Sequence, residues 1–149
     1  MKSEPTVYSI THLKADRVTC WDGVRNYQAR NFMRDQMQVG DGVLFYHSII
    51  EPVGIAGEAK VVKTSYPDFT AWDHKDPHYD PKSRLDRPTW FMVDVQFVKA
   101  CREIITLNRL REIPALEEME VLKRGSRLSV QPVTESAWKI LLKLREWQE

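Results

Sequence analysis

The chain lacks the features that mark membrane and secreted proteins. Only two of its 149 residues are cysteine, and no apolar run approaches the roughly 18 residues that a membrane helix needs. The N-terminal sequence has no signal-peptide pattern. Cys20 and Cys101 lie far apart and form no metal-ligand spacing, which favours a reduced intracellular setting. These absences predict a cytoplasmic protein without membrane contact.

The chain also lacks an excess of charge of either sign. Lys and Arg number 22 against 21 Asp and Glu, and the formal net charge is +1. This excludes a generally basic surface, so any binding of nucleic acid must come from a local patch. The chain has no internal repeat, low-complexity tract or linker, and its length is sufficient to bury a real core. The sequence therefore predicts a single domain over residues 1–149.

The hydrophobic pattern predicts more strand than helix. Runs of β-branched and aromatic residues predict strands at 6–10, 43–48, 53–63, 90–98 and 127–132. Helical periodicity predicts helices at about 24–37, at 107–113, at 115–123 and from Thr134 onward. Residues 66–88 contain four prolines and predict a long surface excursion. Since strands and helices do not alternate, the pattern indicates an α+β fold, a small curved or barrel-like sheet with helices around it.

Catalytic and cofactor signatures are also weak. His47 and Ser48 are adjacent on an expected strand, so their side chains point to opposite faces and cannot pair directly. Neither a Walker-type nor a dinucleotide-binding glycine pattern is present. His74 and His78 could hold zinc with nearby carboxylates, but Pro77 prevents the helix that would place both on one face. The sequence predicts a solvated loop there, and no metal, cofactor or catalytic residue.

Residues 20–34, CWDGVRNYQARNFMR, gather arginines and amides around aromatic side chains with a single acid, Asp22. On the expected helix, Tyr27, Arg30, Asn31 and Arg34 share the face opposite an apolar stripe. Arginine binds phosphate with two parallel hydrogen bonds, asparagine can bind a base edge, and aromatic rings stack on bases. A merely solvated helix face is the alternative.

A second basic cluster lies near the C-terminal end. Residues 121–145 hold six Lys or Arg and one acid, whereas residues 102–120 hold three basic and five acidic residues. Lys123, Arg124 and Arg127 are the densest part of this cluster. Charge segregated in this way is typical of a patch that contacts a phosphate backbone.

Large aromatic residues could form either a core or a pocket. Trp21, Tyr46 and Trp90 are core residues on the simplest interpretation, because large aromatics are usually buried. A pocket becomes plausible because polar residues occur in the neighbouring segments. These are Ser3, Asn26, His47, Ser48, Ser129 and Gln131. Buried polar groups need hydrogen-bond partners, which a ligand can supply.

Several segments taken together resemble the EVE domain family. They are KSEP (2–5) with YSI (8–10), W-x-GVRNYQARN (21–31), GDGVLFYHS ending at Ser48, GIAG (54–57), P-x-W (88–90) and RLSVQPV (127–133). They follow the family's order over nearly the whole chain, and GVRNYQARN and RLSVQPV are the most specific. Membership of this family, within the PUA-like superfamily, implies a strongly bent β-barrel with surrounding helices.

The resemblance also implies a function and a site. The implied partner is DNA or RNA with a modified base, such as 5-methylcytosine or an oxidised form, held in an aromatic and polar pocket. The implied pocket walls are Trp21, Tyr46 and Trp90. The implied base-edge contacts are Ser3, Asn26, His47, Ser48 and Gln131, although Asn26 could instead cap its own helix. The implied phosphate contacts are Arg25, Arg30, Arg34 and Arg127.

Two other functions fit the same residues. The first is an enzyme acting on nucleotides or RNA, for which His47 or Asp94 would be the acid or base. The second is a small-molecule sensor that uses the same pocket. The short bacterial members of the family favour a bacterial cytoplasmic protein here, and a eukaryotic source would favour the nucleus. The sequence does not determine the oligomeric state.

Overall fold

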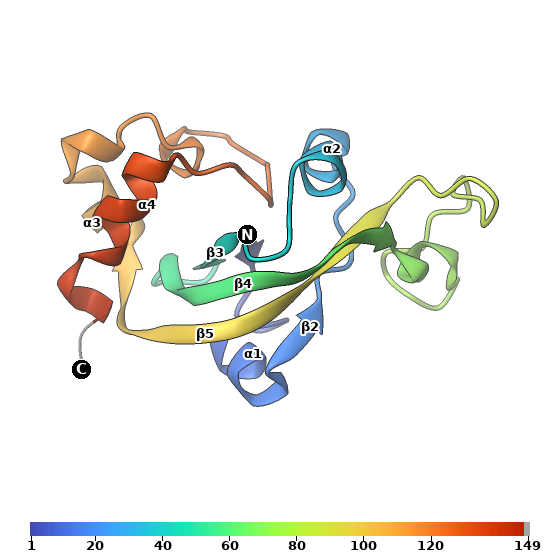
Figure 1. Cartoon of the computed structure of the whole chain (residues 1–149), viewed down its shortest axis with the longest axis horizontal. Helices are drawn as coiled ribbons and strands as arrows, with labels where there is room; N and C mark the ends of the chain where they lie inside the picture. The colour runs from blue at the N-terminus through green and yellow to red at the C-terminus, as the bar shows by residue number, and fades with distance from the viewer. Residues whose placement is uncertain (148–149) are drawn as a thin grey trace.

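The computed structural model describes residues 1–147 and is built on one five-stranded mixed sheet (Figure 1). Its strands are β1 (Lys2–Ser3), β2 (Val18–Cys20), β3 (Gly42–His47), β4 (Gly54–Pro67) and β5 (Phe91–Thr106), in the order β1-β3-β4-β5-β2. β1 runs parallel to β3, and the other pairs are antiparallel. The expected α+β class is confirmed. Within residues 1–147 the sheet remains open between β1 and β2, so the barrel is not closed.

β4 and β5 are long strands that together cross the whole molecule (Figure 1). Their pairing shifts register at four places, the first between Ile55 and Gly57. Such bulges bend and twist a sheet locally. A Cβ atom at Gly57 would overlap the side chain of Ile10, so glycine is needed for this close approach. The GIAG segment therefore combines a bulge with a close approach to α1.

Helices cover the sheet at separate places. They are α1 (Ile10–Asp16), α2 (Tyr27–Asp35), α3 (Leu107–Arg111) and α4 (Glu135–Leu142). Short 3-10 helices lie at Phe69–Trp72, Pro114–Leu116, Glu120–Leu122 and Arg145–Trp147. In Figure 1, α3 and α4 lie at one end of the molecule and the excursion between β4 and β5 lies at the other. No helix of the described residues is long and apolar enough to cross a bilayer.

Side chains cap the starts of these helices. Asn26 accepts a hydrogen bond from the Ala29 amide at 3.0 Å, and Thr134 accepts one from the Ala137 amide at 3.2 Å. Each bond satisfies an amide that has no partner within its own helix. The helix expected from Thr134 onward is confirmed, and so is the capping alternative for Asn26.

The two faces of β3 build two separate cores. Val43 and Phe45 pack with α1 and α2, whereas Leu44 and Tyr46 pack with α3 and α4. Successive side chains of a strand point to opposite faces, so a strand buried on both sides must be apolar throughout. The strand predicted at 43–48 is confirmed as β3, and its residues from Val43 to His47 are buried.

Two strand predictions are wrong. Residues 6–10 form a loop and the start of α1, because Ser9 and His12 make reciprocal capping bonds there. Residues 127–132 form no strand; instead the carbonyl of Ser129 accepts a hydrogen bond from the Lys2 amide at 2.7 Å. Both segments contain β-branched residues, but local capping and tertiary contacts outweigh that weak preference. The pattern also failed to indicate β2.

Candidate functional site

A cavity of about 380 Å³ opens where β1, β2 and the loop before α1 meet. We call it the Trp21 pocket. The residues that line it are Lys2, Ser3, Val7, Tyr8, Thr19, Cys20, Trp21, Asp22 and His78. They come from β1, the loop before α1, β2 with the residues that follow it, and the excursion between β4 and β5. A cavity of this size is within the range of small-ligand sites.

The indole of Trp21 is a rigid wall of this pocket. Its ring meets Phe45 edge to face, with centroids 5.4 Å apart and planes at 86°. Its backbone amide donates a hydrogen bond to the carbonyl of Val93 at 2.7 Å. Only 8% of the residue is exposed. No hydrogen bond of its indole N–H is recorded among residues 1–147, so this donor is available to a ligand.

Hydrogen bonds also fix a wall formed by Ser3 and Tyr8. The Ser3 hydroxyl donates to the Tyr8 carbonyl at 2.7 Å, and the Tyr8 hydroxyl donates to Asp16 Oδ2 at 2.7 Å. Burial and the bond to Asp16 raise the pKa of Tyr8 to about 12, so this phenol stays protonated. Burial also lowers the pKa of the Lys2 ammonium, against a smaller opposing effect of Glu120. The wall therefore combines a fixed polar surface with one amine.

Asp22 is the acid at the rim. Partial burial raises the pKa of its carboxyl, and the nearby Asp68 carboxylate raises it further. His78 lies beside this segment, with its imidazole against Gly23 so closely that a Cβ at Gly23 would overlap the ring. Gly23 also has φ of +76°, a conformation that favours glycine. An acceptor, Asp22, and an imidazole thus flank the opening.

Arg25 holds the excursion against the segment that carries Trp21. Its Nη1 forms an ion pair with Asp68 Oδ2 at 2.8 Å, and its Nε and Nη2 donate to the carbonyl of His78. Burial of Asp68 opposes its ionisation, but hydrogen bonds from Thr70, Arg25 and Gly23 outweigh burial and lower the pKa of this carboxyl. Arg25 was expected to contact phosphate, but in this structure its guanidinium is engaged by Asp68 and by the carbonyl of His78.

Trp90 and Tyr46 are not walls of the Trp21 pocket. Trp90 stacks on Tyr27 with centroids 4.9 Å apart, and its indole donates to Asp80 Oδ2 at 2.7 Å. Tyr46 points to the core that contains α3 and α4 because it lies on the opposite face of β3 from Phe45. The structure therefore does not bring the three expected aromatic walls together.

His47 is a structural residue in this arrangement. Its Nε2 accepts a hydrogen bond from the Ile10 amide at 3.1 Å, and only 8% of the residue is exposed. Burial lowers the pKa of its imidazole, so it holds the start of α1 in the neutral form. Asp94 is also engaged, because its Oδ1 accepts a hydrogen bond from the Tyr66 hydroxyl at 2.5 Å. Both residues named for the enzyme alternative therefore have structural partners.

The remaining polar candidates also bind the protein itself. The Ser48 amide donates to the Ser3 carbonyl at 3.0 Å, which supports the pocket from behind without lining it. Gln131 Nε2 donates to the carbonyl of Leu128 at 2.7 Å. With Asn26 capping α2, only Ser3 and Trp21 of the eight expected ligand contacts line the Trp21 pocket.

The sequence reasoning missed the other residues of this pocket. Lys2 and Asp22 are direct neighbours of Ser3 and Trp21, so adjacency in the matched segments was the available signal. His78 was assigned to a solvated loop, but this residue is half-buried at the pocket edge. Nothing in its local sequence indicates that contact, since Gly23 lies far away along the chain.

The arginines expected to contact phosphate differ in how far other protein groups already engage their side chains. Arg30 lies over the Tyr27 ring at 4.9 Å and donates to the carbonyl of Thr89 at 2.8 Å. Arg34 pairs with Asp35 at 2.7 Å, but the two side chains are 37% and 53% exposed, so solvent screens this pair and it is exchangeable. Arg127 is exposed and has no recorded ion pair among the described residues.

Residues 1–147 contain no group of three or more His, Cys, Asp or Glu side chains that could hold a metal.

Comparisons of the sequence and of the structure with known proteins point to the same family. The model of the EVE domain family matches residues 1–144. Human thymocyte nuclear protein 1 is 44% identical over 164 residues, which cover 98% of this chain and 72% of that protein. A crystal structure from Pseudomonas syringae is 44% identical, with TM-score 0.92 and coverage of 95% of both chains. A crystal structure of human THYN1 protein in complex with 5-methylcytosine-containing DNA is 45% identical, with TM-score 0.91, covering 100% of this chain and 96% of that one.

Proposed function

This chain belongs to the EVE domain family, and we propose that it is a non-catalytic module that binds nucleic acid and holds a modified base in the Trp21 pocket. The observation that carries the proposal is the human relative bound to 5-methylcytosine-containing DNA, at 45% identity over the whole of this chain. The family match over residues 1–144 supports one EVE domain over residues 1–149. The last two of these residues lie outside the described ones.

A base within a duplex hides both faces in the stack, so the pocket must receive a base that is flipped out or single-stranded. Unstacking costs a few kcal/mol, and stacking on an aromatic side chain returns roughly 1–3 kcal/mol. Trp21 is suited to this role because Phe45 and the Val93 carbonyl fix its position before a ligand arrives. A wall that is already ordered adds little entropic cost on binding.

Asp22 gives the pocket a preference among bases. Cytosine presents an amino donor at N4, whereas thymine presents a carbonyl acceptor at the equivalent position. A carboxylate at the rim accepts a hydrogen bond from the cytosine amino group and repels the thymine carbonyl. The available indole N–H of Trp21 and the ammonium of Lys2 supply donors for the acceptor atoms of the same base.

The methyl group of 5-methylcytosine adds less binding free energy than stacking does. Burying one methyl-sized group stabilises the bound state by about 0.8 kcal/mol, which corresponds to about fourfold in affinity. A larger preference for 5-methylcytosine over cytosine requires a closely fitting wall. Val7 and Tyr8 supply apolar surface in this pocket for such a fit.

Arg30, Arg34 and Arg127 remain the proposed phosphate contacts. Arg34 can exchange its exposed partner Asp35 for a phosphate at small cost, and Arg127 is exposed. Because the module must share a compartment with its nucleic acid, we place it in the cytoplasm of a bacterium or in the nucleus of a eukaryote.

The test is a fluorescence-anisotropy titration of labelled oligonucleotides that differ only at one central base. Cytosine, 5-methylcytosine, 5-hydroxymethylcytosine and thymine are compared in single strands and duplexes at several salt concentrations. We expect a modified cytosine to bind most tightly and Trp21→Phe to weaken that binding. Trp147→Phe, outside the pocket, is the matched control. Equal affinity for all four bases would reject modified-base recognition, and an absence of salt dependence would reject nucleic-acid binding.

A further inference from the structure

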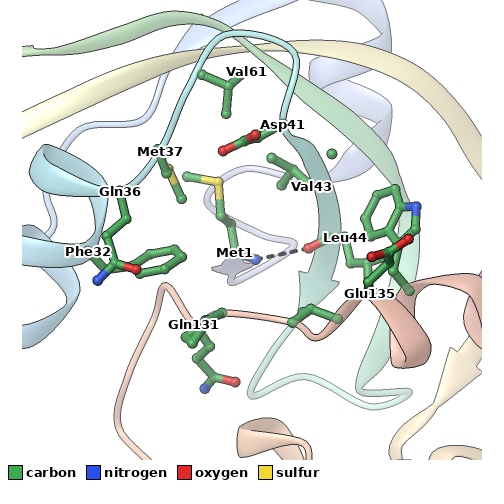
Figure 2. A pocket seen from close by; sticks show the side chains of 14 residues that line it. Met1, Phe32, Gln36, Met37, Asp41, Val43, Leu44, Val61, Gln131 and Glu135 are labelled. Carbon is green, nitrogen blue, oxygen red and sulfur yellow. Dashed lines mark hydrogen bonds between the residues drawn. The ribbon is translucent and has the colours of Figure 1, made fainter.

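A second cavity, larger than the Trp21 pocket, lies on another part of the molecule. It has a volume of about 510 Å³ and opens between α2, the turn before β3 and the start of α4 (Figure 2). None of its lining residues belongs to the Trp21 pocket. Since the proposed base-binding function does not use it, this cavity needs a separate account. We call it the Trp138 cavity.

The Trp138 cavity has apolar walls of the kind that bind small organic molecules. Phe32 and Met37 come from α2 and the residues after it, and Met1 lies between them and β3 (Figure 2). Trp138, a residue of α4, also lines the cavity. A side chain at Gly42 would overlap the Trp138 ring, so the indole is seated directly on the start of β3. Two aromatic rings and two methionines therefore face one space.

The ionisable side chains of the cavity are both acidic. Asp41 lies on the turn before β3, and Glu135 lies in the first turn of α4 (Figure 2). No Lys, Arg or His side chain is among the described residues that line it. The amine of Met1 donates to the Leu44 carbonyl at 2.9 Å, and burial lowers the pKa of this amine to about 5. It therefore adds no positive charge to the cavity at neutral pH.

Neither acid is fully engaged by the protein. Asp41 Oδ2 accepts a hydrogen bond from the Gln38 amide at 2.9 Å, and no partner of its Oδ1 is recorded among residues 1–147. Glu135 pairs with Lys139 at 2.7 Å, but the two side chains are 80% and 65% exposed. An ion pair this exposed contributes little, so a ligand can displace Lys139.

We propose that the Trp138 cavity binds a small organic cation, an ammonium group carried on an aromatic or branched apolar body. The carboxylates attract the ammonium, the aromatic rings of Phe32 and Trp138 can contact a cation, and the methionines adapt to the apolar part. Nucleic acid is a poor occupant, because a phosphate would meet two carboxylates, and no basic side chain is among the described residues that line the cavity.

A matched pair of probes tests this inference. The cation 4-(trimethylammonio)benzyl alcohol and the neutral 4-tert-butylbenzyl alcohol have the same shape and differ in charge. Each is titrated into the full-length protein at low salt, with chemical-shift changes of the Trp138 and Phe32 signals as the measurement. We expect the cation to bind at least fivefold more tightly than the neutral probe. Equal affinities, or no shift with either probe up to 10 mM, would overturn the proposal.

Variants then assign the charge preference to particular residues. Asp41→Asn and Glu135→Gln should each weaken binding of the cation about threefold to tenfold while leaving the neutral probe unchanged. Glu103→Gln, an exposed acid elsewhere on β5, is the matched control and should have no effect. Lys139→Met should strengthen binding of the cation about twofold to threefold, because Glu135 then loses its competing partner. A general loss of folding cannot produce that gain.

The same variants separate this inference from the proposed base-binding function. None of the three substitutions alters the Trp21 pocket, so binding of a 5-methylcytosine oligonucleotide should be unchanged. If Lys139→Met fails to strengthen binding and the two acid variants fail to weaken it, the assignment of Asp41 and Glu135 as the cation site is wrong.

Discussion

Arg25 and Asp68 form a 2.8 Å ion pair that joins two segments lying far apart in the sequence. Asp68 is fully buried, and the Arg25 side chain is 22% exposed. The pair ties the segment with Trp21 and Asp22 to the excursion with His78, so both sides of the Trp21 pocket depend on it. The arginine that the sequence suggested for phosphate therefore holds the pocket together.

Replacing Arg25 should destabilise the protein. Arg25→Met leaves the Asp68 carboxylate buried without its partner, and we expect a loss of about 2–4 kcal/mol in the free energy of unfolding. Urea denaturation measures this loss. The double variant Arg25→Met with Asp68→Asn removes the buried charge, so it should lose less than the two single variants added together. An Arg25→Met protein as stable as wild type would contradict the structural role of the pair.

Acid should weaken the attachment of α1 through His47. Burial lowers the folded-state pKa of His47 below its ordinary value of 6.5, so the folded state favours the neutral ring. This contribution to stability is complete above pH 6.5 and is lost as the pH falls through the lower folded-state pKa. Urea denaturation between pH 7 and pH 5 should show falling stability in wild type. His47→Gln, which keeps an acceptor for the Ile10 amide but does not titrate, should show a smaller fall. His74→Gln should behave as wild type.

Removing the acid at the pocket rim should reduce recognition of cytosine. Asp22→Ala loses a hydrogen bond to a charged group, and we expect about tenfold weaker binding of a 5-methylcytosine oligonucleotide. The preference over a thymine oligonucleotide should fall by a similar factor. Anisotropy titration measures both values, and Glu103→Ala serves as the control. If the substitution weakened binding of both oligonucleotides by the same factor, Asp22 would not be contacting the base edge.

The contacts with phosphate should show in how the binding affinity for oligonucleotides depends on salt concentration. Each phosphate contact contributes roughly 0.9 to the slope of log affinity against log salt for a duplex, and about 0.7 for a single strand. Arg127→Gln should lower this slope by about one such step without changing the preference among bases. Lys14→Gln, an exposed residue on α1, should leave the slope unchanged. A slope unaltered by Arg127→Gln would remove this residue from the interface.

The sequence predicted the elements whose pattern is strong and local. β3 was predictable because apolar residues on both of its faces fit only a strand buried on two sides. α2 and α4 were predictable from their periodicity and from the capping residues Asn26 and Thr134. β2 was missed because three residues give no usable pattern, and α1 was missed because the capping box of Ser9 lay inside an apparent strand.

The sequence predicted less of the candidate site than of the secondary structure. Tyr46 was expected to share a pocket with Trp21, yet Tyr46 points to one face of β3 whereas Trp21 packs with residues of the other face. Arg25 was expected to be free because its partner, Asp68, lies 43 residues away. Such contacts depend on the tertiary arrangement, which no local pattern encodes. Ser3 and Trp21 do line one pocket, and their binding role stays a prediction.

The division of β3 between two cores also limits how this protein can change during evolution. Its residues can be exchanged one by one for others of similar volume, since each contacts a single core. Inserting or deleting one residue within the strand would instead reverse every later side chain, sending Phe45 toward α4 and Tyr46 toward α1. Relatives should therefore differ in the composition of this strand while keeping its length. Gaps in their alignments belong in the excursion between β4 and β5.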